Sequence, residues 1–144
     1  MRSRTASAAG LAALLFAGAL AAEPLADCPA TPNCVSSTAS DPERRVAAWR
    51  ITDPAGWAAI VERADGLARS TVTARDDSYL HLEVSSMLFG FVDDLELRYD
   101  RERGVIDVRS ASRSGKWDLG VNRRRVESLA DELRAAGLIA PTGD

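Results

Sequence analysis

The chain has 144 residues, of which 46% are hydrophobic and 27% charged, and its formal net charge is −3. These values exclude a wholly disordered chain, a collagen-like repeat and a polytopic membrane protein, and the length allows one domain. An acidic chain is a poor nucleic-acid binder, because neutralisation of phosphates by Lys and Arg supplies most of that affinity. With one histidine and two cysteines in the chain, we expect neither a metal site nor a cofactor.

Residues 1–22 are expected to lie outside the fold. Arg2 and Arg4 precede an uncharged stretch, residues 5–22, that is rich in Ala, Leu and Gly and ends in small residues. This is the layout of a secretory signal peptide. The stretch is also long enough to span a bilayer as an uncleaved anchor, and membrane contact is expected only through it in that case. Both alternatives predict export to the periplasm or cell envelope.

Residues 23–45 are rich in Pro, Ser and charged residues without an apolar period, which predicts an extended arm ahead of a single domain over residues 46–140. The arm contains Cys28 and Cys34. Their spacing matches neither a CxxC redox motif nor a CxxCH haem site. Because an exported chain meets an oxidising compartment, we predict a disulfide between them.

The domain is predicted to begin with a short strand over residues 45–51. Asp53 and Pro54 then predict the start of a helix, since Asp is a favoured N-cap and Pro is favoured in the first turn. One apolar face follows at helical spacing, formed by Trp57, Ile60, Val61, Ala64 and Leu67.

Four strands are predicted next, at residues 70–75, 79–85, 91–99 and 105–110, from β-branched runs and from alternating apolar and polar side chains. The apolar run from Met87 to Phe91 interrupts this alternation. We interpret it as a bulged strand that enters the core, with Gly90 permitting the kink. The alternative is that the run covers an apolar ligand or a partner.

Charges set the register of the last two strands. Placing Leu97 opposite Val108 pairs an acid with an arginine at the neighbouring position on each side. Placing it opposite Ile106 sets two acids against each other. We therefore predict the first register, which also places the inward-facing Asp93 opposite Ser112. The flanking pairs are then Glu96 with Arg109 and Arg98 with Asp107.

A final helix is predicted over residues 122–136, with Asn122 as its N-cap and Gly137 as its stop. Its buried face consists of Val126, Leu129, Ala130 and Leu133. The order of elements is then β-α-β-β-β-β-α. This order predicts an α+β fold, in which a small antiparallel sheet of four to five strands carries two helices on one face.

Three segments in this order resemble motifs of the DUF1499 family, a domain family of unknown function. They are Cys28-Pro29-x-x-Pro32-Asn33-Cys34-Val35-Ser36-Ser37, Gly90-Phe91-x-Asp93-Asp94-x-Glu96 and Arg109-Ser110-x-Ser112-Arg113-x-Gly115-x-x-Asp118-Leu119-Gly120-Val121-Asn122-Arg123-x-Arg125. The resemblance covers essentially the whole chain after residue 22. It implies a small, often exported α+β domain of bacterial and plastid-type proteins, and it implies no activity, because the family has none assigned.

The segment from residue 109 to residue 125 is the candidate binding site. Hydroxyl groups, guanidinium groups and the free N–H groups of a helix start together suit an anion. The three arginines 123–125 would lie in the first turn, where cations oppose the helix dipole, so we expect a compensating anion nearby. We predict a module that binds a small anionic ligand or an envelope protein through Arg109, Ser110, Ser112, Arg113, Asn122 and Arg123.

An internal network is the alternative source of that anion. Its acids would be Asp93, Asp94 and Asp118, and we interpret Asp93 as a buried acid neutralised by arginine. The alternative function is a hydrolase that uses one of the three acids. Asp93 and Asp94 cannot act as a dyad, because adjacent strand residues point to opposite faces. His81 is interpreted as a solvent-facing or hydrogen-bonded strand residue.

Overall fold

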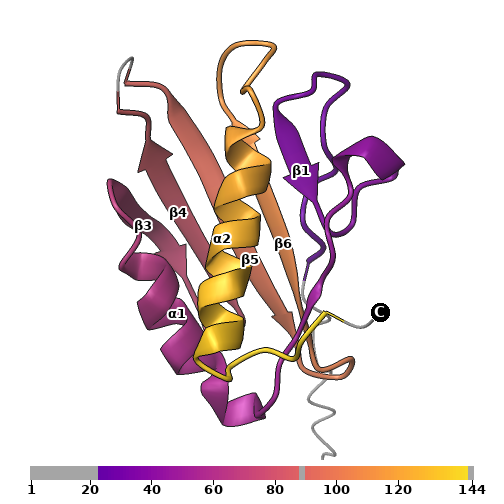
Figure 1. The fold of residues 1–144 in the computed structure, drawn as a ribbon, viewed down its shortest axis with the longest axis vertical. Helices are drawn as coiled ribbons and strands as arrows, with labels where there is room; N and C mark the ends of the chain where they lie inside the picture. The colour runs from indigo at the N-terminus through magenta and orange to yellow at the C-terminus, as the bar shows by residue number, and fades with distance from the viewer. Residues whose placement is uncertain (1–22, 88–89, 143–144) are drawn as a thin grey trace, which may run out of the picture.

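The structure is a computed structural model that describes residues 23–87 and 90–142 (Figure 1). The predicted signal segment lies outside these residues. The elements in chain order are β1 (Cys34–Ser36), η1 (Pro42–Arg44), β2 (Trp49–Arg50), η2 (Pro54–Gly56), α1 (Trp57–Asp65), β3 (Ser70–Arg75), β4 (Tyr79–Ser85), β5 (Val92–Asp100), β6 (Val105–Ser112) and α2 (Val121–Ala135). None of the described helices is long and apolar enough to cross a membrane.

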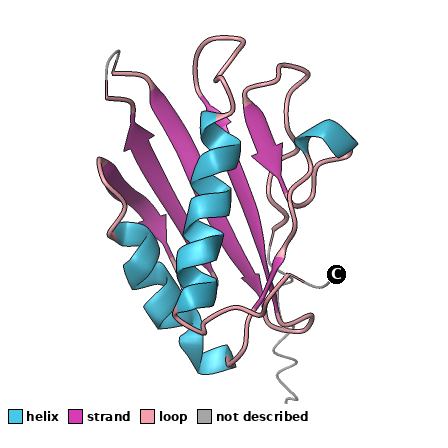
Figure 2. Ribbon diagram, in the orientation of Figure 1, coloured by secondary structure: helices cyan, strands magenta, loops and turns pink. Residues whose placement is uncertain are grey.

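The strands form one antiparallel sheet in the order β1-β6-β5-β4-β3, with β2 also paired to β6. Both α-helices cover the same face of this sheet (Figure 2). The predicted α+β class is confirmed, with six strands instead of four to five. The additional strand is β1, which comes from the predicted arm and pairs Val35 with Ser110 of β6. The arm is therefore part of the sheet, and the Cys28–Cys34 disulfide predicted in it is present.

The predicted register of β5 and β6 is confirmed. Leu97 lies opposite Val108, and Asp93 lies opposite Ser112. Glu96 and Arg109 lie opposite each other and form an ion pair of 2.8 Å, whereas Arg98 lies opposite Asp107 but Asp107 pairs with Arg103. Because side chains alternate across a strand, this register fixes which face of the sheet each residue of the candidate site occupies.

The core lies between the sheet and the two helices. Leu80, Leu82, Leu95, Leu97 and Val108 of the strands are fully buried there, and so are Ile60 of α1 and Leu129 and Leu133 of α2. The ring of Trp57 stacks on Tyr99 with 5.7 Å between their centroids. These contacts fix α2 across the sheet and so determine which of its side chains point inward.

Two predicted elements begin later than expected. Asp53 accepts a hydrogen bond from the N–H of Ala55, as an N-cap does, but it caps the short turn η2, and α1 begins at Trp57. The strand predicted over residues 45–51 is reduced to Trp49–Arg50, because Val46 donates instead to the carbonyl of Ser36. Gly137 ends the last helix as predicted, with φ of +71°.

The interpretation of the run from Met87 to Phe91 as a strand entering the core is wrong for Met87 and Phe91, the two large residues of the run that the structure describes. Leu88 and Phe89 lie outside the described residues, whereas the side chains of Met87 and Phe91 are 76% and 51% exposed. The run connects β4 to β5 at the end of the sheet. Gly90 does adopt a positive φ, +64°, as a kink there requires.

Candidate functional site

A buried ion pair connects the sheet to the last helix. Asp93 of β5 points into the apolar face and is 5% exposed. Its Oδ2 accepts a hydrogen bond of 2.6 Å from Nη2 of Arg125, which is itself 12% exposed. The interpretation of Asp93 as an acid neutralised by arginine is therefore confirmed, and the partner is an arginine that the sequence analysis had not assigned.

Asn122 is the centre of a polar network beside this pair. It is fully buried. Its Oδ1 accepts hydrogen bonds from the Ser110 hydroxyl and from Nη1 of Arg125, at 2.6 and 2.8 Å. Its Nδ2 donates to the carbonyl of Asn33, to Oγ of Ser112 and to Oδ2 of Asp118. One side chain thus joins β6, the disulfide loop and the start of α2.

The prediction that Asn122 caps the helix is wrong. The helix begins at Val121 after Gly120, so Asn122 lies within the first turn, where its side chain faces the sheet. Asp118 takes the capping role, because its carboxylate accepts hydrogen bonds from the backbone N–H groups of Gly120 and Asn122. Burial raises the pKa of Asp118, but these bonds and the one from the Asn122 side chain outweigh it and hold the pKa below its ordinary value.

The opposite face of the sheet carries a second charged network. Arg113 donates to both carboxylate oxygens of Asp94 and, at 2.5 Å, to Glu83. The ring of His81 lies 2.7 Å from the same Asp94, which confirms that this histidine is a hydrogen-bonded strand residue. Beside them Glu96 accepts hydrogen bonds from Tyr79 and Arg109. The acid cluster predicted from Asp93, Asp94 and Asp118 is thereby divided between two faces.

The pKa of Asp94 provides a test of this second network. Burial raises that pKa, but the hydrogen bonds from Arg113 and His81 outweigh burial and lower the pKa below its ordinary value of 3.8. Ionised Asp94 therefore stabilises the fold above pH 3.8, and this contribution is lost as the pH falls through the folded pKa. We expect the difference in unfolding free energy between wild type and Asp94→Asn to shrink as the pH falls below 3.8.

Urea unfolding across an acidic pH series measures this difference. In a chain that carries Arg113→Gln the pH dependence should be weaker, because one donor that lowers the pKa of Asp94 is gone. A difference that persists unchanged into strong acid would contradict the assignment.

The six predicted ligand residues do not converge on one site. Ser110, Ser112 and Asn122 belong to the inner network, whereas Arg109 and Arg113 point to the other face of the sheet. Arg123 lies apart from both groups and donates to the backbone carbonyls of Glu43 and Arg45. The alternation of side chains along β6 makes this separation unavoidable.

The arginines of the first helical turn are compensated within the chain. Arg123 uses backbone carbonyls, Arg124 donates to the carbonyl of Leu119 at 2.8 Å, and Arg125 pairs with Asp93. The helical repeat of the buried positions was the sequence signal that could have predicted that Arg125 faces the sheet. Extended backwards from Val126 and Leu129, the buried face of the helix includes positions 122 and 125.

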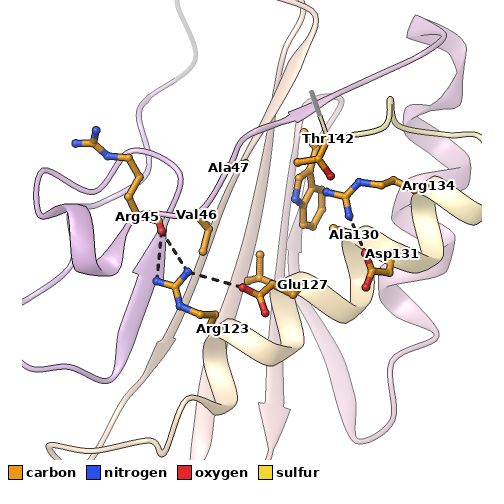
Figure 3. Close-up of a pocket in the computed structure, with 11 residues that line it drawn as sticks. Arg45, Val46, Ala47, Arg123, Glu127, Ala130, Asp131, Arg134 and Thr142 are labelled. Atoms are coloured by element: carbon orange, nitrogen blue, oxygen red, sulfur yellow. Dashed lines mark hydrogen bonds and ion pairs between the residues drawn. The ribbon is translucent and has the colours of Figure 1, made fainter. Parts of the chain in front are cut away.

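A groove lies between α2 and the segment that precedes β2 (Figure 3). Its volume is about 430 Å³, within the range of small-molecule sites. The apolar lining comprises Val46, Ala47, Trp49, Val126 and Ala130. The polar lining comprises Arg45, Arg123, Glu127, Asp131, Arg134 and Thr142. Of the predicted ligand residues, Arg123 lines this groove. Among the described residues, no group of His, Cys, Asp and Glu is arranged to hold a metal ion.

Fold and side chains together define a small α+β domain with one helix-covered sheet face and an internal ion-pair network. A family model described as "Protein of unknown function (DUF1499)" matches residues 24–133. The chain belongs to this DUF1499 family, as its three motifs indicated. No curated protein and no solved structure matches the chain.

Proposed function

We propose that the protein is an exported binding module for a small anionic ligand, and that the ligand binds in the groove between α2 and residues 45–49. The groove combines the features that such ligands need, namely an apolar wall that includes Trp49 and cationic side chains from one helix. The disulfide supports export, since disulfides persist in oxidising compartments.

The observation that carries the proposal is an unused donor at the groove. Arg134 extends from α2 into the groove, where one of its terminal nitrogens pairs with Asp131 at 2.8 Å (Figure 3). Its Nε–H is buried and has no hydrogen-bond partner among the described residues. A buried donor without an acceptor costs free energy, and a rotation of the Arg134 side chain toward an anionic oxygen in the groove would supply that acceptor.

Arg123 provides a second cationic contact from the same helix. Its guanidinium donates to the carbonyls of Glu43 and Arg45, and it lies 3.8 Å from Glu127, a separation that is an ion pair without a hydrogen bond. A ligand carboxylate or phosphate can therefore replace Glu127 as its partner at little cost. Arg45 lines the groove with its backbone, because its guanidinium is directed away from the groove and donates to the carbonyls of Ala39 and Ser40 (Figure 3).

The pKa values and the partners of Asp93, Asp94 and Asp118 favour a binding function over the alternative of hydrolysis. A general acid at neutral pH needs a raised pKa, whereas the pKa values of Asp94 and Asp118 are lowered. Asp93 is buried against Arg125. Each carboxylate is thus occupied by a structural partner.

Ligand-detected thermal unfolding tests the proposal with inorganic phosphate and a panel of phosphorylated and carboxylated metabolites. A true ligand at about a hundred times its Kd should stabilise the wild type by about 2.7 kcal/mol. Arg134→Met and Arg123→Met should remove this stabilisation, because each keeps an aliphatic stem and loses the charge. Arg63→Met, in the last turn of α1, is the matched control and should retain it.

Two results would contradict the proposal. One is the absence of stabilisation by every compound in the panel. The other is an equal stabilisation of the wild type and of both groove variants.

A further inference from the structure

Large apolar side chains are exposed at one end of the molecule. Trp117 and Leu119, in the loop between β6 and α2, are 77% and 86% exposed. Met87 and Phe91, in the connection between β4 and β5, are 76% and 51% exposed. Exposed apolar groups that lie close together mark surfaces that contact a membrane or another protein.

Strand pairing places these two loops side by side. Ser85 at the end of β4 lies opposite Val92 at the start of β5, and the N–H of Arg113 after β6 donates to the carbonyl of the same Val92. Both loops therefore leave the sheet at the end where α2 begins (Figure 1). This end, comprising residues 86–87, 90–91 and 113–120, is called the loop end below.

The β6–α2 loop holds its apolar side chains outward by fixed contacts. Nδ2 of Asn33 donates to the carbonyl of Gly115 at 2.7 Å, and Arg124 donates to the carbonyl of Leu119. Leu119 has φ of +53°, a left-handed conformation that is unfavourable for leucine. The backbone is thus strained in a way that keeps a leucine in solvent, which is a feature of functional loops.

Two cations accompany the exposed apolar side chains of the loop end. Residues 109–125 contain six basic residues and one acid, but Arg109, Arg113 and Arg125 pair with acids of the sheet and Arg123 lines the groove, which leaves Lys116 and Arg124 as the cations of the loop end. The acid, Asp118, is turned inward to cap α2. Lys116, the chain's single lysine, directly precedes Trp117. The exposed apolar groups are therefore flanked by cations.

We propose that the loop end docks on the surface of an anionic lipid bilayer. Trp117 and Leu119 enter the interfacial region, while Lys116 and Arg124 lie at the headgroup phosphates. Trp together with Lys and Arg is the composition that favours a bilayer interface, and anionic headgroups attract the cations. This site is separate from the groove, and its residues do not line the groove.

Tryptophan fluorescence of the full chain tests the proposal. Trp49 and Trp57 are 3% and 8% exposed, and residues 1–22 contain no tryptophan, so Trp117 reports contact with lipid. The probes are vesicles of equal parts phosphatidylglycerol and brominated phosphatidylcholine, and vesicles of brominated phosphatidylcholine alone. We expect a blue shift and quenching with the anionic vesicles, weakened by added salt, and much less of either with the neutral ones.

Three variants give the test its specificity. Leu119→Asn should weaken the interaction on the order of tenfold while preserving the fold, because Asn tolerates the left-handed backbone. Lys116→Gln should weaken it roughly fivefold. Arg75→Gln, at the last residue of β3 and so at the other end of the sheet, is the charge-matched control and should bind as the wild type does.

The proposal is overturned if Trp117 is not quenched by anionic vesicles, which would leave a protein partner as the occupant of the loop end. It is also overturned if quenching is the same in Leu119→Asn, Lys116→Gln and the wild type. Loss of anion binding in the Arg134→Met variant has no bearing on these results, so the two proposals fail independently.

Discussion

Replacing Arg125 with Met should lower the free energy of unfolding by about 3–5 kcal/mol, because it leaves Asp93 buried without its counter-charge. Asp93 is 5% exposed on the apolar face of the sheet, and Arg125 donates to it at 2.6 Å. Urea unfolding followed by circular dichroism measures the change as a shift in midpoint at unchanged slope. The same variant removes a donor to Asn122, which adds to the loss.

Two companion variants separate the charge from the packing. The double variant Arg125→Met with Asp93→Leu should recover much of the lost stability, since an apolar pair of similar volume is often as stable as a buried ion pair. Arg113→Met is the matched control on the other face, where the side chain is 44% exposed and its ion pairs are screened by water. A loss in Arg113→Met as large as in Arg125→Met would contradict the assigned role of burial.

Asn122→Ala should destabilise the fold by about 3 kcal/mol, because it removes the five hydrogen bonds made by a fully buried side chain. The groups affected are the Ser110 hydroxyl, the Asn33 carbonyl and the Asp118 carboxylate. A residue that merely caps a helix would cost about 1 kcal/mol when replaced by Ala. Thermal and urea unfolding of the variant therefore distinguish a network centre from a cap.

Asn33→Ala is the comparison for this prediction. Asn33 is also buried, but its side chain makes fewer contacts, chiefly with Thr31 and the carbonyl of Gly115. We expect a smaller loss of stability than in Asn122→Ala. Equal losses in the two variants would argue against Asn122 as the centre of the network.

The pattern of side chains along each segment was sufficient to predict most strands of the sheet. The bounds of β3 and β4 agree with the predicted residues 70–75 and 79–85, because β-branched composition and alternating side chains are properties of each strand by itself. The register of β5 against β6 followed from opposite charges in directly paired positions. β1 was missed, since three residues in a Pro- and Ser-rich segment carry no periodic signal.

The candidate site required the tertiary structure. Arg109 and Arg113 are close in sequence to Ser110 and Ser112, yet the pleat separates the two pairs onto opposite faces. The groove was not predictable, because residues 45–49 and α2 are remote in sequence and meet only after the chain has packed.

The sequence by itself determined the α+β class, the disulfide, the β5–β6 register and the family, since these depend on side-chain period, cysteine count and neighbouring motifs. Only the tertiary structure decided that Arg125 is the arginine paired with Asp93, while Arg123 lines the groove. The reason is the rotation of α2 about its axis, which is set by burying Val126, Leu129 and Leu133 against the sheet. That packing directs positions 122 and 125 inward and leaves Arg123 facing the groove.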